Sequence, residues 1–173
     1  MKKILSLICA VFLLVLAGCS EEPKTEGTLG DTLHTMFFDI TVRNARKADE
    51  LNEMTPMDEG YHFLIAGVTV KNTTDETIPM GDVDFIIRWG TGDENWDYPA
   101  TVYTDTALSE DQFPAEYKLK EGEEKTGTLV WIVPKDKTSF ILETQDQYTV
   151  NKDEEAQKGQ VYTITFNTSD PAE

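Results

Sequence analysis

Apolar and polar residues alternate with a period of two along much of this chain, and this pattern constrains the fold most strongly. In the stretch YHFLIAGVTVKN (61–72), one face of an extended chain carries Leu64, Ala66, Val68 and Val70. Successive side chains of a β-strand point to opposite faces, so these four residues predict a buried strand face. Phe63 and Ile65 make the other face apolar as well, which predicts a central strand.

Similar runs recur and predict further strands. In HTMFFDITVRN (34–44) and VDFIIRW (83–89) the predicted buried faces are Met36, Phe38, Ile40 and Val42, and then Val83, Phe85, Ile87 and Trp89. The other runs are TLVWIVP (128–134), SFILE (139–143) and VYTITFN (161–167), with shorter ones at PATVY (99–103) and AEYKL (115–119). Polar turn sequences separate them, so about seven or eight short strands are expected.

Helical periodicity is almost absent. The one candidate, NARKADELNEM (44–54), has poorly spaced apolar residues, so we expect a loop there with one helical turn at most. Many short strands without helices predict an all-β chain folded as an antiparallel β-sandwich.

The N-terminus has the layout of an export signal. Lys2 and Lys3 precede an apolar run (4–16) that is too short to span a membrane as a helix, and small residues follow it. The quartet LAGC (16–19) resembles the lipobox of bacterial lipoproteins. That resemblance implies cleavage between Gly18 and Cys19 and attachment of a diacylglycerol to the Cys19 sulfur. Two acyl chains would hold the protein at the extracytoplasmic face of the cell membrane.

This leader sets the expected domain boundaries. We expect a lipoprotein signal peptide over residues 1–18, a lipid-anchored flexible tether over 19–31, a sandwich over 32–167 and a polar tail over 168–173. About 155 residues remain after cleavage, enough for one domain with its own core. Cys9 leaves with the leader, so the remaining cysteine is the lipidated one and no disulfide is expected.

The chain is strongly acidic, with a formal net charge of −17. Without the two leader lysines, 13 of the 15 basic residues face all 32 acidic ones, a net charge of −19. Such a charge argues against nucleic acid and against broad contact with anionic lipid. Solubility and repulsion from an anionic envelope explain it most simply.

Three further stretches carry a family resemblance. They are an aromatic-led strand ending in VTVKN (68–72), the glycine turn and strand of LKEGEEKTGTLVW (119–131), and the stop VPKD (133–136). In this order they are similar to an uncharacterised immunoglobulin-like domain family of bacterial lipoproteins, frequent in Gram-positive bacteria. The resemblance covers about 30–143. It implies an immunoglobulin-like sandwich and no established activity. The stretch 90–113 is longer than the family pattern and the run 161–167 lies beyond it, so a function particular to this chain, if it has one, is expected in these two additions.

Catalytic motifs are missing from the sequence. His34 and His62 are the two histidines, and neither lies in a recognisable motif. No nucleophile elbow, phosphate-binding glycine loop or Cys/His metal spacing is found. We therefore expect no enzyme activity and no cofactor. A hydrolase using carboxylates is a distant alternative, and it would need two acids meeting in a cleft with raised pKa values.

The segment DENWD (93–97) resembles part of a calcium-binding loop. Asp93, Asn95 and Asp97 alternate as in the first half of an EF-hand, but the required glycine is Tyr98 and the required glutamate is Thr104. A looser oxygen site formed by Asp93, Asp97 and Asp105 is an alternative to a solvated acidic turn, and no metal is predicted.

Aromatic residues interleaved with acids between 89 and 117 suggest recognition. Trp89 and Trp131 are expected in the core, whereas Trp96 and Tyr98 follow a turn sequence. With Asp93 and Asp97 they form the candidate ligand-binding set, and ordinary loop packing is the alternative.

The predicted function is an extracytoplasmic, lipid-anchored binding or scaffolding module with a protein, peptide or glycan partner at the cell envelope. The alternative is a ligand-capturing lipoprotein serving a transporter or sensor, which would show a deep pocket.

Overall fold

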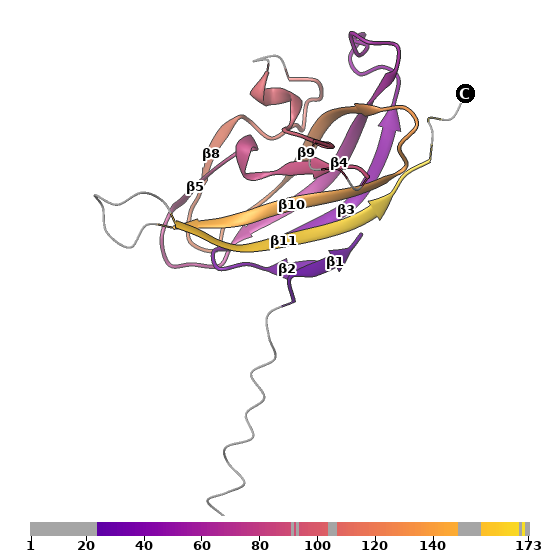
Figure 1. Ribbon diagram of the computed structural model, residues 1–173. Helices are drawn as coiled ribbons and strands as arrows, with labels where there is room; N and C mark the ends of the chain where they lie inside the picture. Colours follow the sequence, from indigo (N-terminus) through magenta and orange to yellow (C-terminus); the bar gives the residue numbers. More distant parts are fainter. Residues whose placement is uncertain are drawn as a thin grey trace, which may run out of the picture.

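The computed structural model describes residues 24–90, 92, 94–103, 107–148, 157–169 and 171, so the leader and Cys19 lie outside the described residues. Over these residues the chain forms two packed β-sheets (Figure 1). The predicted antiparallel β-sandwich is confirmed, with eleven strands in the described part of the chain, several of them very short. No helix in these residues is long and apolar enough to cross a bilayer.

One sheet has four antiparallel strands. In spatial order they are β2 (Thr32–His34), β3 (Phe38–Ala48), β4 (Tyr61–Asn72) and β9 (Glu124–Pro134). The predicted central strand is β4, and its Leu64, Ala66, Val68 and Val70 are all buried in the main core.

The second sheet has five strands, four of them antiparallel. In spatial order they are β1 (Glu26–Thr28), β11 (Gln157–Asn167), β10 (Ser139–Tyr148), β6 (Ile86–Arg88) and β7 (Trp96–Asp97). Strand β1 pairs with β11 in parallel. A separate two-stranded sheet joins β5 (Ile78–Gly81) to β8 (Glu116–Leu119).

The main core lies between the two large sheets. Trp131, Phe85 and Phe140 are among its largest fully buried side chains, and Trp89 also belongs to it. Both tryptophans expected in the core are therefore found there. Burying apolar area at about 25 cal/mol per Å² makes this layer the main source of stability.

A second apolar cluster covers the outer face of the four-stranded sheet. Phe63, Ile65 and Val130 point away from the main core and pack against Ala100 and Leu108. Ala100, in the 3₁₀ turn η2 (Ala100–Val102), and Leu108 thus cover part of a sheet face that would otherwise meet water.

Several predicted elements differ from the structure. Met36 is 55% exposed because the Thr35 hydroxyl accepts hydrogen bonds from the Phe37 and Phe38 N–H groups in a turn, which breaks the alternation. Val83 is 57% exposed because it lies in the 3₁₀ turn η1 (Asp82–Asp84) rather than in a strand. The predicted strand 99–103 is also largely a 3₁₀ turn.

The expected loop at 44–54 begins as strand instead. Strand β3 continues to Ala48 after a bulge between Val42 and Asn44. Gly67 of β4 makes room for the bulge, since a Cβ atom there would lie 2.8 Å from the Asn44 Oδ1. The bulge shifts the pairing by one residue, which conceals the strand from a strict period of two. A tight Leu51–Met54 bridge follows.

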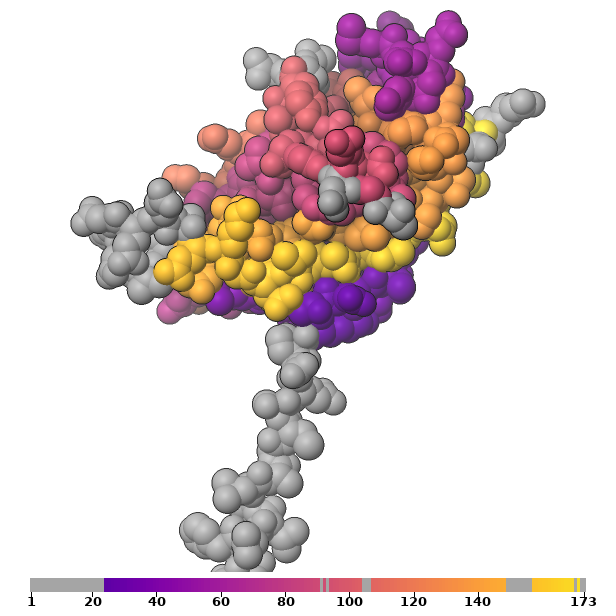
Figure 2. All heavy atoms as spheres, in the orientation of Figure 1, coloured from indigo at the N-terminus to yellow at the C-terminus, as the bar shows by residue number. Residues whose placement is uncertain are grey.

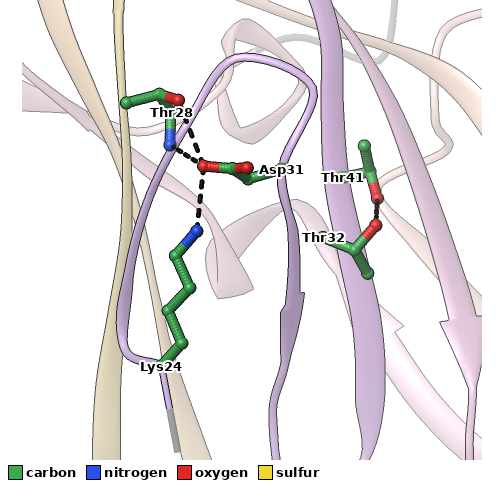
Figure 3. A network of polar contacts seen from close by, with 5 residues as sticks. All are labelled: Lys24, Thr28, Asp31, Thr32 and Thr41. Carbon is green, nitrogen blue, oxygen red and sulfur yellow. Dashed lines mark hydrogen bonds and ion pairs between the residues drawn. The ribbon is translucent and has the colours of Figure 1, made fainter.

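Part of the segment predicted as a tether belongs to the sandwich. Within 19–31, β1 pairs with β11, and Asp31 closes the turn after it (Figure 3). The Asp31 Oδ2 accepts from the Thr28 N–H at 2.8 Å and lies 3.1 Å from the Lys24 Nζ. Gly30 has a φ of 89°, which favours glycine. A flexible tether would therefore have to end before β1.

Candidate binding surfaces

Two of the predicted site residues lie together at the edge of the five-stranded sheet. Strand β7 pairs with β6 so that Trp96 stands opposite Arg88. The Trp96 and Tyr98 rings meet edge to face, with centroids 5.2 Å apart and planes at 90°. Trp96 is 38% exposed, and Tyr98 is half-buried. Edge-to-face packing holds the indole in place while leaving part of it open to solvent.

These two rings border a groove of about 470 Å³ on the outer face of that sheet. Figure 2 shows this part of the surface, where β10 (orange) and β11 (yellow) lie beside the rose-coloured segment that contains β6 and β7. Outward-facing residues of β6, β10 and β11 complete the groove, among them Arg88, Glu143, Gln145, Gln147 and Lys158. We call it the Trp96 groove.

The other two predicted residues behave differently. The Asp97 Oδ1 accepts from the Tyr103 hydroxyl at 2.5 Å and from the Tyr98 N–H at 2.8 Å, and Asp97 does not line the groove. The Asp97 hydrogen bond raises the pKa of Tyr103 to about 12. Asp93 lies outside the described residues, as does Asp105 of the looser oxygen site. Asp97 thus orders the loop rather than facing the groove.

A second hollow opens between the two sheets, and the sequence analysis did not predict it. This inter-sheet cavity measures about 360 Å³. Its apolar walls are Phe37, Phe38, Ile40, Ile78, Pro79 and Met80. Two carboxylates, Asp84 of η1 and Asp146 of β10, also line it. The missed signal was the alternation Phe140, Leu142, Thr144, Asp146, which extends β10 beyond the predicted run 139–143.

Both carboxylates are held by backbone groups. The Met36 N–H lies 3.3 Å and 3.2 Å from the two Asp146 oxygens, and the Gly81 N–H donates to the Asp84 Oδ2 at 2.8 Å. Burial raises the pKa of Asp84, and the neighbouring charge of Asp82 raises it further. Burial and then the charge of Asp146 raise the pKa of Tyr162 to about 12.

Asp84 also lines the Trp96 groove and a third hollow of about 560 Å³ along β5 and β8. It therefore stands where the three hollows adjoin. The reason is topological, because η1 carries the chain from the small β5–β8 sheet into the five-stranded sheet.

Each histidine pairs with a carboxylate. The His34 Nδ1 lies 2.6 Å from the Asp39 Oδ1, and the His62 Nδ1 lies 2.9 Å from the Asp49 Oδ1. Over the residues that the structure describes, no three His, Cys, Asp or Glu side chains are grouped closely enough to hold a metal ion.

The sheets and hollows define this chain as a β-sandwich domain with grooves on its outer and inter-sheet faces. It belongs to the family described as a domain of unknown function, DUF4352, whose model matches residues 27–168. The resemblance found in the sequence is thereby confirmed. The resemblance extends further than the sequence indicated, because the family model begins within β1 and includes β11. The run 161–167 is therefore part of the family domain and not an addition to it. None of the curated proteins matches the chain.

Two solved structures share the fold. One is from Bacillus subtilis and is described as "a putative lipoprotein (ycdA)", with 16% identity and a TM-score of 0.55 over 84% of this chain and 39% of that chain. This chain thus spans about two fifths of that longer protein. The yjhA protein of Bacillus subtilis has 17% identity and a TM-score of 0.55 over 83% of this chain and 99% of that one.

Proposed function

We propose that this protein is an extracytoplasmic binding module, anchored by lipid at Cys19, that recognises a glycan of the cell envelope through the Trp96 groove. The observation that carries the proposal is the Trp96–Tyr98 pair standing at the rim of a polar sheet face. The lipobox supports the anchor, as does the lipoprotein description of one structure with the same fold.

The groove suits a neutral polar ligand. Its charged lining residues balance, because Arg88 and Lys158 match Glu143 and Asp84 in number. Gln145 and Gln147 add amide groups that both donate and accept hydrogen bonds. A sugar ring presents an apolar face to an aromatic side chain and hydroxyls to such amides, whereas a strongly charged peptide would leave one of the charged groups unmatched.

Retention on envelope glycan tests the proposal. The purified domain is passed over immobilised cell-wall polysaccharide as the wild type, Trp96→Ala, Tyr98→Ala and the double variant. We expect the wild type to be retained and the double variant to lose at least about tenfold in affinity, the loss of one or two well-packed aromatic anchors. The matched control is Tyr61→Ala, an aromatic residue at the start of β4 in the other sheet. Equal retention of the wild type and the double variant would contradict the groove as the site.

The anchor has its own test. Cys19→Ser removes the sulfur that would carry the lipid, so the protein should appear in the medium or persist as an uncleaved precursor. Unchanged processing and unchanged membrane attachment would show that the anchor assignment is wrong.

A ligand-capturing lipoprotein serving a transporter or sensor is the second candidate, and the inter-sheet cavity is the observation that favours it. A hydrolase based on paired carboxylates would have to use Asp84 and Asp146, the two acids that line this cavity.

A further inference from the structure

We infer that the inter-sheet cavity, which adjoins the Trp96 groove, is a second binding site, for a small organic cation that carries an amine on an apolar body. The cavity lies between β3, β5 and the C-terminal half of β10. It shares Asp84, Thr144, Gln145 and Gln147 with the Trp96 groove, whereas its apolar walls, among them Phe38, Ile40 and Ile78, belong to the cavity and not to that groove.

The size and walls of the cavity define the body of the ligand. At about 360 Å³ it falls in the range of small-molecule sites. Its walls reach Ile40 and Met80, both of which belong to the main core. A ligand there would therefore place its apolar part against side chains that are fixed by the packing of the sandwich. Six apolar or aromatic wall residues favour a ligand with an apolar body, and Thr35, Thr144, Gln145 and Gln147 add polar groups to the lining.

The charges of the cavity define the head group. Asp84 and Asp146 are its two ionisable acids, and no Lys, Arg or His is among its lining residues. Neither acid forms an ion pair with any residue that the structure describes. Asp146 is buried and Asp84 is half-buried. A carboxylate removed from water without a counter-charge is costly, and a bound cation would supply that charge. Burial raises the pKa of Asp84, the Gly81 N–H partly opposes this, and the charge of Asp82 raises the pKa further.

An amine fits better than a metal ion. Calcium takes six to eight oxygen ligands, whereas only two carboxylates line the cavity, and the described residues contain no group of three His, Cys, Asp or Glu side chains that could hold a metal ion. An ammonium group needs only a few acceptors. The backbone bonds from Gly81 to Asp84 and from Met36 to Asp146 fix both carboxylates before a ligand arrives, which lowers the entropic cost of binding.

Titration calorimetry with phenethylamine as the probe tests this inference. Its neutral isostere, 2-phenylethanol, has the same apolar body without the charge. We expect the amine to bind the wild type at least about tenfold more tightly than the alcohol. Asp84→Asn and Asp146→Asn should each weaken amine binding about tenfold or more, as is usual when one partner of a buried charge pair is removed. The control Asp136→Asn, in the turn between β9 and β10, should leave amine binding unchanged.

A cavity-filling variant keeps the test decisive if Asp146→Asn fails to fold. Ile78→Phe places a ring in the cavity without altering its charges and should abolish binding, with folding verified by circular dichroism. N-acetyl-lysine amide forms a second arm, because the same chemistry occurs on a polypeptide. Binding of either amine, lost in Asp84→Asn and in Ile78→Phe, supports the inference. Equal binding of amine and alcohol, or no binding of either amine, overturns it. Calorimetry with free amines is independent of glycan retention, so the two proposals can fail separately.

Discussion

Arg88 and Glu143 form a two-point ion pair between neighbouring strands, with 2.7 Å from the Nε to the Oε2 and 3.3 Å from the Nη2 to the Oε1. The pair joins the short strand β6 to β10 and lies in the floor of the Trp96 groove. Because the two charges neutralise each other, the floor presents polar atoms without a net field. This pairing explains why an acidic protein can offer a groove for a neutral ligand.

The first prediction concerns this pair. Arg88→Lys keeps the charge but loses the planar, two-point contact, so the free energy of unfolding should fall by about 0.5–1 kcal/mol. Urea unfolding at low salt measures the change, and the difference should shrink at high salt. If Arg88→Lys and the wild type have the same midpoint, the planar two-point contact adds nothing to the stability that a single charge contact supplies.

The second prediction concerns the pH dependence caused by Asp84. Its pKa is raised by burial, so the folded state holds this proton more tightly than the unfolded state does. Stability from Asp84 is therefore present at low pH and is lost as pH rises above 3.8 and through the folded pKa. Asp84→Asn should be more stable than the wild type at pH 7, and the difference should vanish as pH falls toward 3.8. Thermal unfolding across this pH range measures the difference. If Asp84→Asn is less stable than the wild type at pH 7, the predicted destabilisation by the charged Asp84 is wrong.

Asp84 thereby links the second prediction to the amine site. The same substitution that stabilises the fold at pH 7 should weaken amine binding, because one uncompensated charge causes both effects. Such an exchange of stability for function is common at binding sites.

The third prediction separates two residues that the alternation placed on one face. Phe85 is fully buried in the main core, whereas Val83 is exposed in η1. Phe85→Ala should lower the free energy of unfolding by about 3–5 kcal/mol through lost burial and a new cavity. Val83→Ala should change it by about 0.5 kcal/mol or less. Equal losses in denaturant unfolding would contradict the position of η1.

The fourth prediction concerns the edge strand β1. Hydrogen bonds from the Thr28 N–H and then from Lys24 lower the pKa of Asp31, so the charged form is favoured in the folded state. The stability that it contributes is present at neutral pH and is lost as pH falls below 3.8. Asp31→Ala should speed amide exchange in β1 while leaving exchange in β4 unchanged, as read by NMR. Equal exchange rates in β1 would show that Asp31 does not hold this strand.

The sequence alone predicted the sandwich, the long central strand and the buried tryptophans. The physical reason is that strand periodicity depends only on which residues along the chain are apolar. In β4 this alternation is uninterrupted from Leu64 to Val70. The sequence also indicated that Trp96 and Tyr98 are exposed to some degree, because they follow a polar turn.

Only the tertiary structure decided the bulge at Asn44, the parallel pairing of β1 and the partners of each carboxylate. A bulge needs a space on the neighbouring strand, here at Gly67, and pairing of β1 needs an open edge of β11; neither can be seen in a local pattern. The inter-sheet cavity likewise brings together Asp84 and Asp146, which are far apart in the chain. The alternation predicts which face of a strand a side chain lies on. The charged and hydrogen-bonding partners of that side chain come from other strands, which meet it only when the sheets pack.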